Sequence, residues 1–88
     1  MNEEWQIEFS NSAQDFIRKL KLKDNVERIL RKISELKNGP FSIQYKSIVG
    51  LKHTYRIRVG DYRITYEADF ISKIINILEV GTRENIYD

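Results

Sequence analysis

The side chains best suited to chemistry in this sequence are three arginines within residues 54–67, TYRIRVGDYRITYE. Arg56 and Arg58 alternate with apolar residues before a Gly-Asp turn, and Arg63 follows the turn in a second alternating run. Successive side chains of a β-strand point to opposite faces of a sheet, so the pattern predicts a hairpin with an apolar inner face and an arginine-lined outer face. Guanidinium groups held on a rigid sheet are suited to binding a polyanion.

The distribution of charge favours a polyanionic partner more strongly than the net charge of +2 does. Residues 41–66 contain five basic side chains and a single acidic one, Asp61, whereas residues 67–88 contain two basic and five acidic ones. The basic residues of the middle segment are Lys46, Lys52, Arg56, Arg58 and Arg63. A local basic patch is typical of nucleic-acid-binding proteins, and a small net charge can conceal it.

Composition narrows the class of protein further. The 88 residues are 41% hydrophobic and 32% charged, which is typical of a single folded domain spanning residues 1–88. The sequence has no cysteine and one histidine, His53, so we expect no disulfide, no metal site and no cofactor. The first residues are acidic and polar, and no apolar run reaches the roughly 20 residues of a membrane-spanning helix. We therefore expect a cytoplasmic protein with no membrane partner.

A short strand and two amphipathic helices are predicted before the hairpin. Residues 5–9 alternate apolar and polar side chains, as a half-buried strand does. Ser12, with Asp15 three residues later, resembles a capping box at the start of the first helix. The second helix is predicted to begin near Asp24 and to end at residues 38–40, Asn-Gly-Pro, because proline cannot continue a helix. The apolar stripes of the two helices contain Ala13, Phe16, Ile17, Leu20, Val26, Ile29, Leu30, Ile33 and Leu36.

The remaining segments complete an α+β fold. Residues 41–50 are predicted to form a loop, and the apolar run 73–80 is typical of a central strand covered on both faces. The predicted order is an N-terminal strand, a helical hairpin and a three-stranded antiparallel meander, with the helices packed on one sheet face and the arginines on the other. The outward face of the second helix mixes both charges, so we interpret it as solvated surface. That face carries Arg28, Arg31, Lys32 and Glu35.

Two motifs in the C-terminal half resemble the RelE/ParE superfamily of bacterial and archaeal toxins. The first is the hairpin YRIRVGDYR at residues 55–63, and the second is VGTRE at residues 80–84. The predicted order of elements also fits, so the resemblance covers nearly the whole chain. It implies a RelE-like fold and, most closely, an mRNA interferase toxin of a type II toxin–antitoxin system. Such toxins are metal-independent endoribonucleases that cleave mRNA in the ribosomal A site, inhibit translation, and are neutralised by a RelB-like antitoxin.

Two other activities stay open under the same resemblance. ParE-type members inhibit DNA gyrase, and they act by binding a protein rather than by chemistry of their own. A catalytically silent relative that only binds an antitoxin or a nucleic acid is the third alternative.

The resemblance also implies a set of site residues. The catalytic set is Arg56, Arg58, Arg63, Arg83 and Tyr87, and the RNA-binding set is Lys46 and Lys52. Tyr87 matches a tyrosine that stacks on a base in relatives, and Arg56 and Arg58 stand where well-studied relatives carry lysines.

The change from lysine to arginine leaves the general base open. A guanidinium clamps phosphate but effectively never loses its proton, so these arginines are unsuited to deprotonating the ribose 2′-hydroxyl that attacks the adjacent phosphate. Lys52, His53, Glu84, a ribosomal group, or no base at all are the alternatives for that step.

Overall fold

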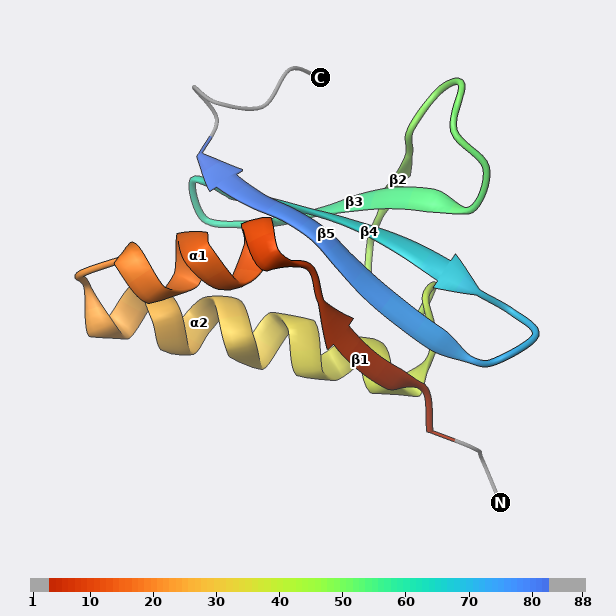
Figure 1. The fold of residues 1–88 in the computed structure, drawn as a ribbon, viewed down its shortest axis with the longest axis horizontal. Coiled ribbons are helices and arrows are strands. Elements are labelled where there is room, and N and C mark those ends of the chain that lie inside the picture. Colours follow the sequence, from red (N-terminus) through yellow and green to blue (C-terminus); the bar gives the residue numbers. More distant parts are fainter. Residues whose placement is uncertain (1–3, 83–88) are drawn as a thin grey trace.

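The computed structural model describes residues 4–82, which form two helices packed against a five-stranded sheet (Figure 1). In chain order the elements are β1 (Gln6–Phe9), α1 (Asn11–Lys19), α2 (Lys23–Ser34), the 3-10 helix η1 (Glu35–Asn38), β2 (Lys46–Ser47), β3 (Thr54–Val59), β4 (Tyr62–Asp69) and β5 (Ile74–Thr82). The strand order across the sheet is β1-β5-β4-β3-β2. β1 runs parallel to β5, and all other neighbouring strands are antiparallel. The predicted α+β fold and its meander, β3-β4-β5, are confirmed.

The hydrophobic core lies between the helices and one face of the sheet, as the predicted pattern requires. Both helices lie on the same side of the sheet (Figure 1). The buried core side chains come from α1, α2, η1 and the three long strands: Ala13, Ile29, Ile33, Leu36, Ile57, Val59, Ile64, Tyr66, Ile75, Ile77 and Val80. Phe16 and Ile17 pack against this cluster and are half-buried. Leu30 was expected in the core but is 40% exposed, because residues 29, 33 and 36 form the stripe that faces the sheet.

The start of α1 differs from the prediction, because Ser10 rather than Ser12 caps the helix. The backbone N–H of Ala13 donates to the Ser10 hydroxyl oxygen at 3.1 Å, and the same hydroxyl donates to the carbonyl oxygen of Leu78 at 2.6 Å. The capping side chain therefore also ties the helix to β5. A serine in this position satisfies one of the unpaired N–H groups at a helix start.

β5 is a central strand, as its apolar run predicted, since it lies between β1 and β4. Its pairing with β4 skips Leu78, which forms a bulge between Ile77 and Glu79. Because a bulge adds one residue to the strand, Ile77 and Val80 both turn toward the helices although they are three residues apart. The opposite face of β5 carries the exposed Glu79, so the expectation that both faces are covered was wrong.

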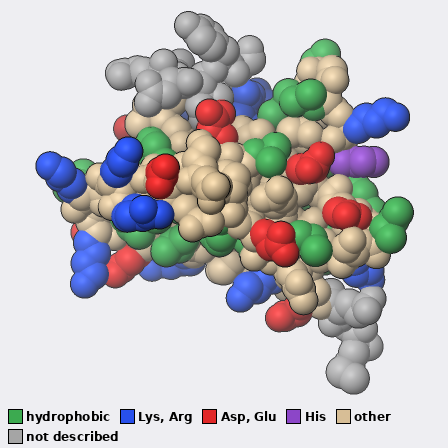
Figure 2. Space-filling model, viewed as in Figure 1, with side chains coloured by type: hydrophobic (Ala, Val, Ile, Leu, Met, Phe, Trp, Pro, Cys, Tyr) green, Lys and Arg blue, Asp and Glu red, His purple; other side chains and the backbone are tan. Residues whose placement is uncertain are grey.

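The side of the molecule that carries α1 and β1 has a mixed surface charge. Lys and Arg side chains are interspersed with Asp and Glu there (Figure 2). Arg18 and Asp15 of α1 form an exposed ion pair with an N–O distance of 3.5 Å. Within residues 4–82, no helix has the length and apolar character needed to cross a membrane.

Candidate functional site

The β3–β4 hairpin places two of the predicted arginines directly opposite each other. Its two-residue turn begins with Gly60, whose φ of 59° is strained for other residues and is accessible to glycine. The turn fixes the register in which Arg58 pairs with Arg63. Directly paired side chains leave the same face of the sheet with Cβ atoms about 4.5–5.5 Å apart. The two guanidiniums therefore start from neighbouring points on the face away from the helices.

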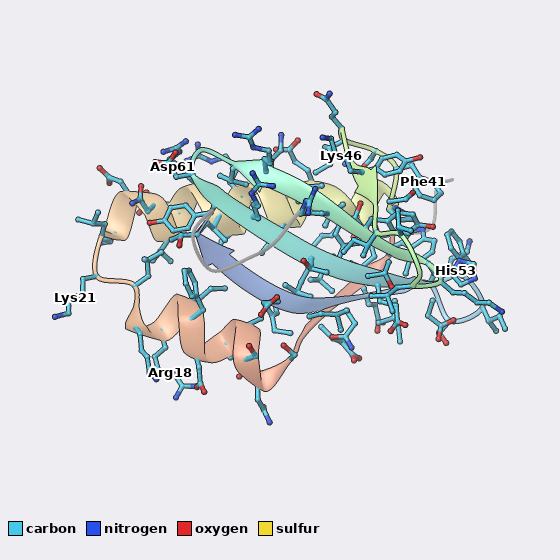
Figure 3. The ribbon with its side chains drawn as sticks, turned by 90° about the horizontal axis from the view of Figure 1, so that it is seen from above. Arg18, Lys21, Phe41, Lys46, His53 and Asp61 are labelled. Carbon is cyan, nitrogen blue, oxygen red and sulfur yellow. The ribbon has the colours of Figure 1, made fainter. Side chains whose placement is uncertain are left out.

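Two further cations, Lys46 and Arg56, lie beside Arg58 and Arg63 and extend them into a row across adjacent strands. Lys46 of β2 pairs with Arg56 of β3, and Arg56 lies on the same face as Arg58 two residues later. Figure 3 shows the sheet from above, with Lys46 toward one end and Asp61 at the hairpin turn. Nitrogen-tipped side chains gather over the sheet between these two labels. Three neighbouring strands thus contribute to one basic surface.

A cavity of about 340 Å³ opens beside this row. Its lining residues are Lys32, Gln44, Tyr45, Lys46, Arg56, Ile57, Arg58 and Arg63. It lies at the edge of β3, because β2 pairs with only two residues of that strand. Lys32 of α2 and the loop before β2 supply the other walls. We call this cavity the basic pocket.

The arginines of the basic pocket differ in burial, which corrects the prediction of an open arginine face. Arg58 is exposed and Arg56 is half-buried, whereas Arg63 is only 5% exposed. Arg63 lies on β4, where Arg58 is its partner on one side and Gly81 on the other. Its neighbour on the same face, Thr65, is also buried. The structure therefore buries a side chain that the alternating pattern placed in solvent.

The chemistry of the basic pocket is that of an anion site. Five of its lining residues are cationic, and none of the described ones is acidic. Arginine can bind two oxygens of one phosphate at once, and lysine adds a mobile point charge. Across the described part of the chain, no three His, Asp or Glu side chains gather to hold a metal ion. The five cationic side chains of the pocket are of the kind that bind anions such as a phosphate.

Two other residues considered for the site, Lys52 and His53, lie away from the basic pocket. Lys52 is exposed in the turn before β3, where its carbonyl oxygen accepts a hydrogen bond from the Thr54 hydroxyl at 2.8 Å, and it does not line the basic pocket. His53 is also in that turn, with its ring 5.1 Å from the ring of Phe70. Figure 3 shows His53 at the end of the sheet opposite Asp61. Arg83, Glu84 and Tyr87 lie outside the described residues.

Of the four lining residues that the sequence did not indicate, Lys32 and Tyr45 have side chains suited to binding a nucleotide. Lys32 was assigned to the solvated helix face, yet it is half-buried and lines the basic pocket. It borders the apolar stripe because it lies three residues after the buried Ile29, and that spacing was the available signal. Tyr45 directly precedes Lys46 of the basic segment, and that position was the signal that it could reach the site.

The loop that supplies Tyr45 is fixed by hydrogen bonds. The Ser42 hydroxyl lies 2.8 Å from the carbonyl oxygen of Gly39 and 3.0 Å from that of Glu35. The buried Tyr66 hydroxyl donates to the carbonyl oxygen of Pro40 at 2.6 Å. Burial raises the pKa of the Tyr66 phenol far above its ordinary range, and the nearby phenols of Tyr55 and Tyr45 add to the effect. Tyr66 therefore stays a neutral donor and anchors the start of the loop.

Comparison with solved structures supports the fold. The RelE–RelB complex from the archaeon Pyrococcus horikoshii matches with a TM-score of 0.74 and 23% identity, over 98% of this chain and 100% of that one. The isolated E. coli RelE toxin matches with a TM-score of 0.79 and 23% identity, over 93% and 87%. The RelB–RelE complex from Methanococcus jannaschii has 28% identity and a TM-score of 0.72, over 92% and 95%. Such identities establish the RelE-like fold rather than the activity.

Sequence comparison establishes the family. No protein of curated function matches the chain significantly in sequence. The family model described as the ParE toxin of type II toxin–antitoxin systems matches residues 7–87. The two motifs and the predicted order of elements had indicated the same relationship. The chain therefore belongs to the ParE toxin family of type II toxin–antitoxin systems, within the RelE/ParE superfamily.

Proposed function

We propose that this toxin is a ribosome-dependent mRNA endonuclease that inhibits translation. The main support for this proposal is the basic pocket. Lys32, Lys46 and the three arginines line it together, and none of its described lining residues is acidic. A ParE-type inhibitor of gyrase needs a protein-binding surface rather than a cationic cavity of this size.

The proposed reaction is an in-line attack of a ribose 2′-oxygen on the adjacent phosphorus. A bond forms between the 2′-oxygen and phosphorus, and the bond from phosphorus to the 5′-oxygen breaks. The products are a 2′,3′-cyclic phosphate and a 5′-hydroxyl, and the proton lost by the 2′-hydroxyl balances the one gained by the leaving oxygen. Negative charge builds on the phosphate oxygens during the attack, and fixed cations stabilise that charge.

We assign the electrostatic role to Arg56, Arg58 and Arg63. The buried Arg63 is held in place by the sheet, and the exposed Arg58 opposite it can close on the other side of a phosphate. Lys46 and Lys32 add positive charge at the wall of the pocket. No protein base is assigned, because the hydroxyl proton can leave to solvent while the cations lower the barrier. Arg83 and Tyr87 stay predictions from the family resemblance.

The proposal includes two macromolecular partners besides mRNA. The ribosome positions the mRNA, since a pocket that is open at a sheet edge encloses little of an RNA chain. Because ribosomes are the proposed target, we also propose that the toxin acts in the cytoplasm. A RelB-like antitoxin is the third partner, because relatives such as the Methanococcus jannaschii toxin are known as RelB–RelE complexes. Acidic side chains of an antitoxin could cover the basic pocket and block access to RNA.

Gyrase inhibition is the second candidate function, because the matching family model is that of ParE toxins. One experiment separates the two. Purified toxin is added to ribosomes carrying a defined mRNA, and new 5′ ends are mapped; the same preparation is added to gyrase in a supercoiling assay. We expect new 5′ ends on ribosome-bound mRNA, negligible cutting of naked mRNA, and unchanged supercoiling. Loss of supercoiling activity without mRNA cleavage would assign the toxin to the second function.

A further inference from the structure

A row of aromatic rings meets the basic pocket at Tyr45. The ring of Tyr45 lies 4.9 Å from that of Phe41 with 36° between the ring planes, and 5.4 Å from Tyr55 in an edge-to-face arrangement. Tyr55 in turn lies 5.7 Å from the buried Tyr66. Tyr45 is therefore supported from beneath by rings that lead into the core. An aromatic residue held in this way loses little conformational entropy when a ligand stacks on it.

The supported rings are nevertheless open to solvent. Tyr45 is 39% exposed and Phe41 is 48% exposed. Hydrogen bonds at Pro40 and Ser42 hold the start of the loop that carries both rings. Large apolar side chains that are exposed yet rigidly placed are typical of a binding surface.

Charge around Tyr45 selects the kind of ligand. Tyr45 lines the basic pocket and directly precedes Lys46, whose strand partner is Arg56. Figure 3 shows Phe41 and Lys46 near each other at the same end of the sheet. An acidic peptide would satisfy the cations but would not need a flat ring beside them. Single-stranded RNA supplies both parts, since its phosphates require cations and its unpaired bases stack on aromatic faces.

We propose that Tyr45, backed by Phe41, is a stacking platform for an unpaired RNA base next to the phosphate held by the arginines. The inference rests on the proposed function, because it extends the same site by one nucleotide. Tyr45 acts as a positioning residue: the stacked base fixes the register of the RNA so that the scissile phosphate meets Arg58 and Arg63. The platform is distinct from Tyr87, which lies outside the described residues.

The test compares two trinucleotides that carry the same charge. Binding of ApApA and of an abasic trinucleotide is measured by NMR titration of the isolated toxin, and the ratio of the two Kd values reports base stacking. We expect ApApA to bind about tenfold to a hundredfold more tightly, which corresponds to the loss of one or more base–aromatic stacks. Tyr45→Leu should reduce this ratio by about tenfold, whereas Tyr45→Phe should preserve it.

Phe70→Leu is the matched control. Phe70 is 41% exposed and its ring lies 5.9 Å from that of Phe41, but it does not line the basic pocket. This variant loosens the same aromatic cluster without removing the platform, so its Kd ratio should equal that of the wild type. Circular dichroism of each variant establishes that the fold is retained.

The outcomes separate this inference from the proposed function. An unchanged Kd ratio in folded Tyr45→Leu overturns the platform, even if the wild type cleaves ribosome-bound mRNA. If Tyr45→Leu weakens antitoxin binding but leaves the ratio of the two Kd values unchanged, the stacking platform is overturned and Tyr45 is a protein contact instead. A wild type that cleaves no mRNA but keeps the Tyr45-dependent ratio overturns the nuclease and leaves an RNA-binding surface.

Discussion

Arg58 and Arg63 face each other on adjacent strands, and one is exposed while the other is buried. Like charges that are directly opposite in a sheet destabilise it. A phosphate bound between the two guanidiniums would remove that repulsion and would gain charge-assisted hydrogen bonds from both. The pair is therefore suited to holding an anion, and its two members should respond differently to substitution because their burial differs.

Arg58→Ala should abolish most of the cleavage activity while leaving the fold intact. A lost charge-assisted contact costs about 1.5–3 kcal/mol, which lowers the rate by roughly tenfold to a hundredfold or more. The free energy of unfolding in urea should change by no more than about 0.5 kcal/mol, because Arg58 is exposed. Arg18→Ala on α1 is the matched control and should leave cleavage unchanged. Full activity of Arg58→Ala would remove Arg58 from the site.

Arg63→Ala should lower both activity and stability. The side chain is 5% exposed, so its replacement by alanine removes buried contacts and opens space in the sheet. We expect the free energy of unfolding to fall by about 1–3 kcal/mol, measured by urea denaturation beside Arg58→Ala. Equal stability of the two variants would contradict the enclosed position of Arg63. This expectation replaces that of a neutral surface substitution, which the alternating sequence pattern had suggested.

The lysines distinguish electrostatic catalysis from base catalysis. Lys52→Met should leave single-turnover cleavage nearly unchanged, since Lys52 does not line the basic pocket. Lys46→Met removes a lining cation and should slow cleavage by about tenfold, comparable to one charge-assisted contact. Arg56→Lys restores a group that can lose its proton and should raise the rate at alkaline pH. A drop of about a hundredfold or more for Lys52→Met, equivalent to about 2.7 kcal/mol of barrier, with unchanged ribosome affinity, would establish a base at position 52.

Tyr66 should make the fold sensitive to alkaline pH. Its folded-state pKa is raised, mainly by burial, so the folded state holds the phenol proton more tightly than the unfolded state does. The stabilising contribution is complete below the unfolded pKa of about 10 and is lost as the pH rises above it. Above about pH 10, where a free phenol loses its proton, the free energy of unfolding should fall less steeply with pH in Tyr66→Phe than in the wild type.

The same variant has a second readout near neutral pH. Tyr66→Phe removes the donor to the Pro40 carbonyl oxygen at 2.6 Å. Its free energy of unfolding should therefore be lower than that of the wild type by about 1–3 kcal/mol, because the buried acceptor loses its partner. If the free energies of unfolding of Tyr66→Phe and the wild type fell in parallel above about pH 10, the effect of burial on the Tyr66 phenol would be contradicted.

The meander and both helices could be predicted because short-range patterns determine them. The alternation around Gly60 gives the hairpin and its register, and the apolar stripes of the two helices give their buried faces. The parallel pairing of β1 with β5 joins segments almost 70 residues apart, and no local pattern indicates it. The bulge at Leu78 was hidden because a continuous apolar run fits either a strand covered on both faces or a strand whose register shifts.

The candidate site was predictable in its charges but not in its shape. Arg56, Arg58, Arg63 and Lys46 meet as the alternating pattern and the local basic excess had indicated. Arg63 is buried on a sheet face that the pattern placed in solvent, and Lys32 lines the pocket because α2 packs beside the edge of β3. Both are consequences of tertiary packing, which the spacing of residues within one segment does not encode.

If the basic pocket promotes attack by a ribose 2′-hydroxyl, removal of that one hydroxyl from the mRNA should prevent cleavage. The mRNA is first mapped for its cleavage site on the ribosome, and the nucleotide on the 5′ side of the cut is then replaced by its 2′-deoxy form. We expect cleavage at this phosphate to disappear. The same replacement one position downstream should leave cleavage at this phosphate unchanged. The product from the unmodified mRNA should end in a 2′,3′-cyclic phosphate. Continued cleavage at the 2′-deoxy position would contradict the account.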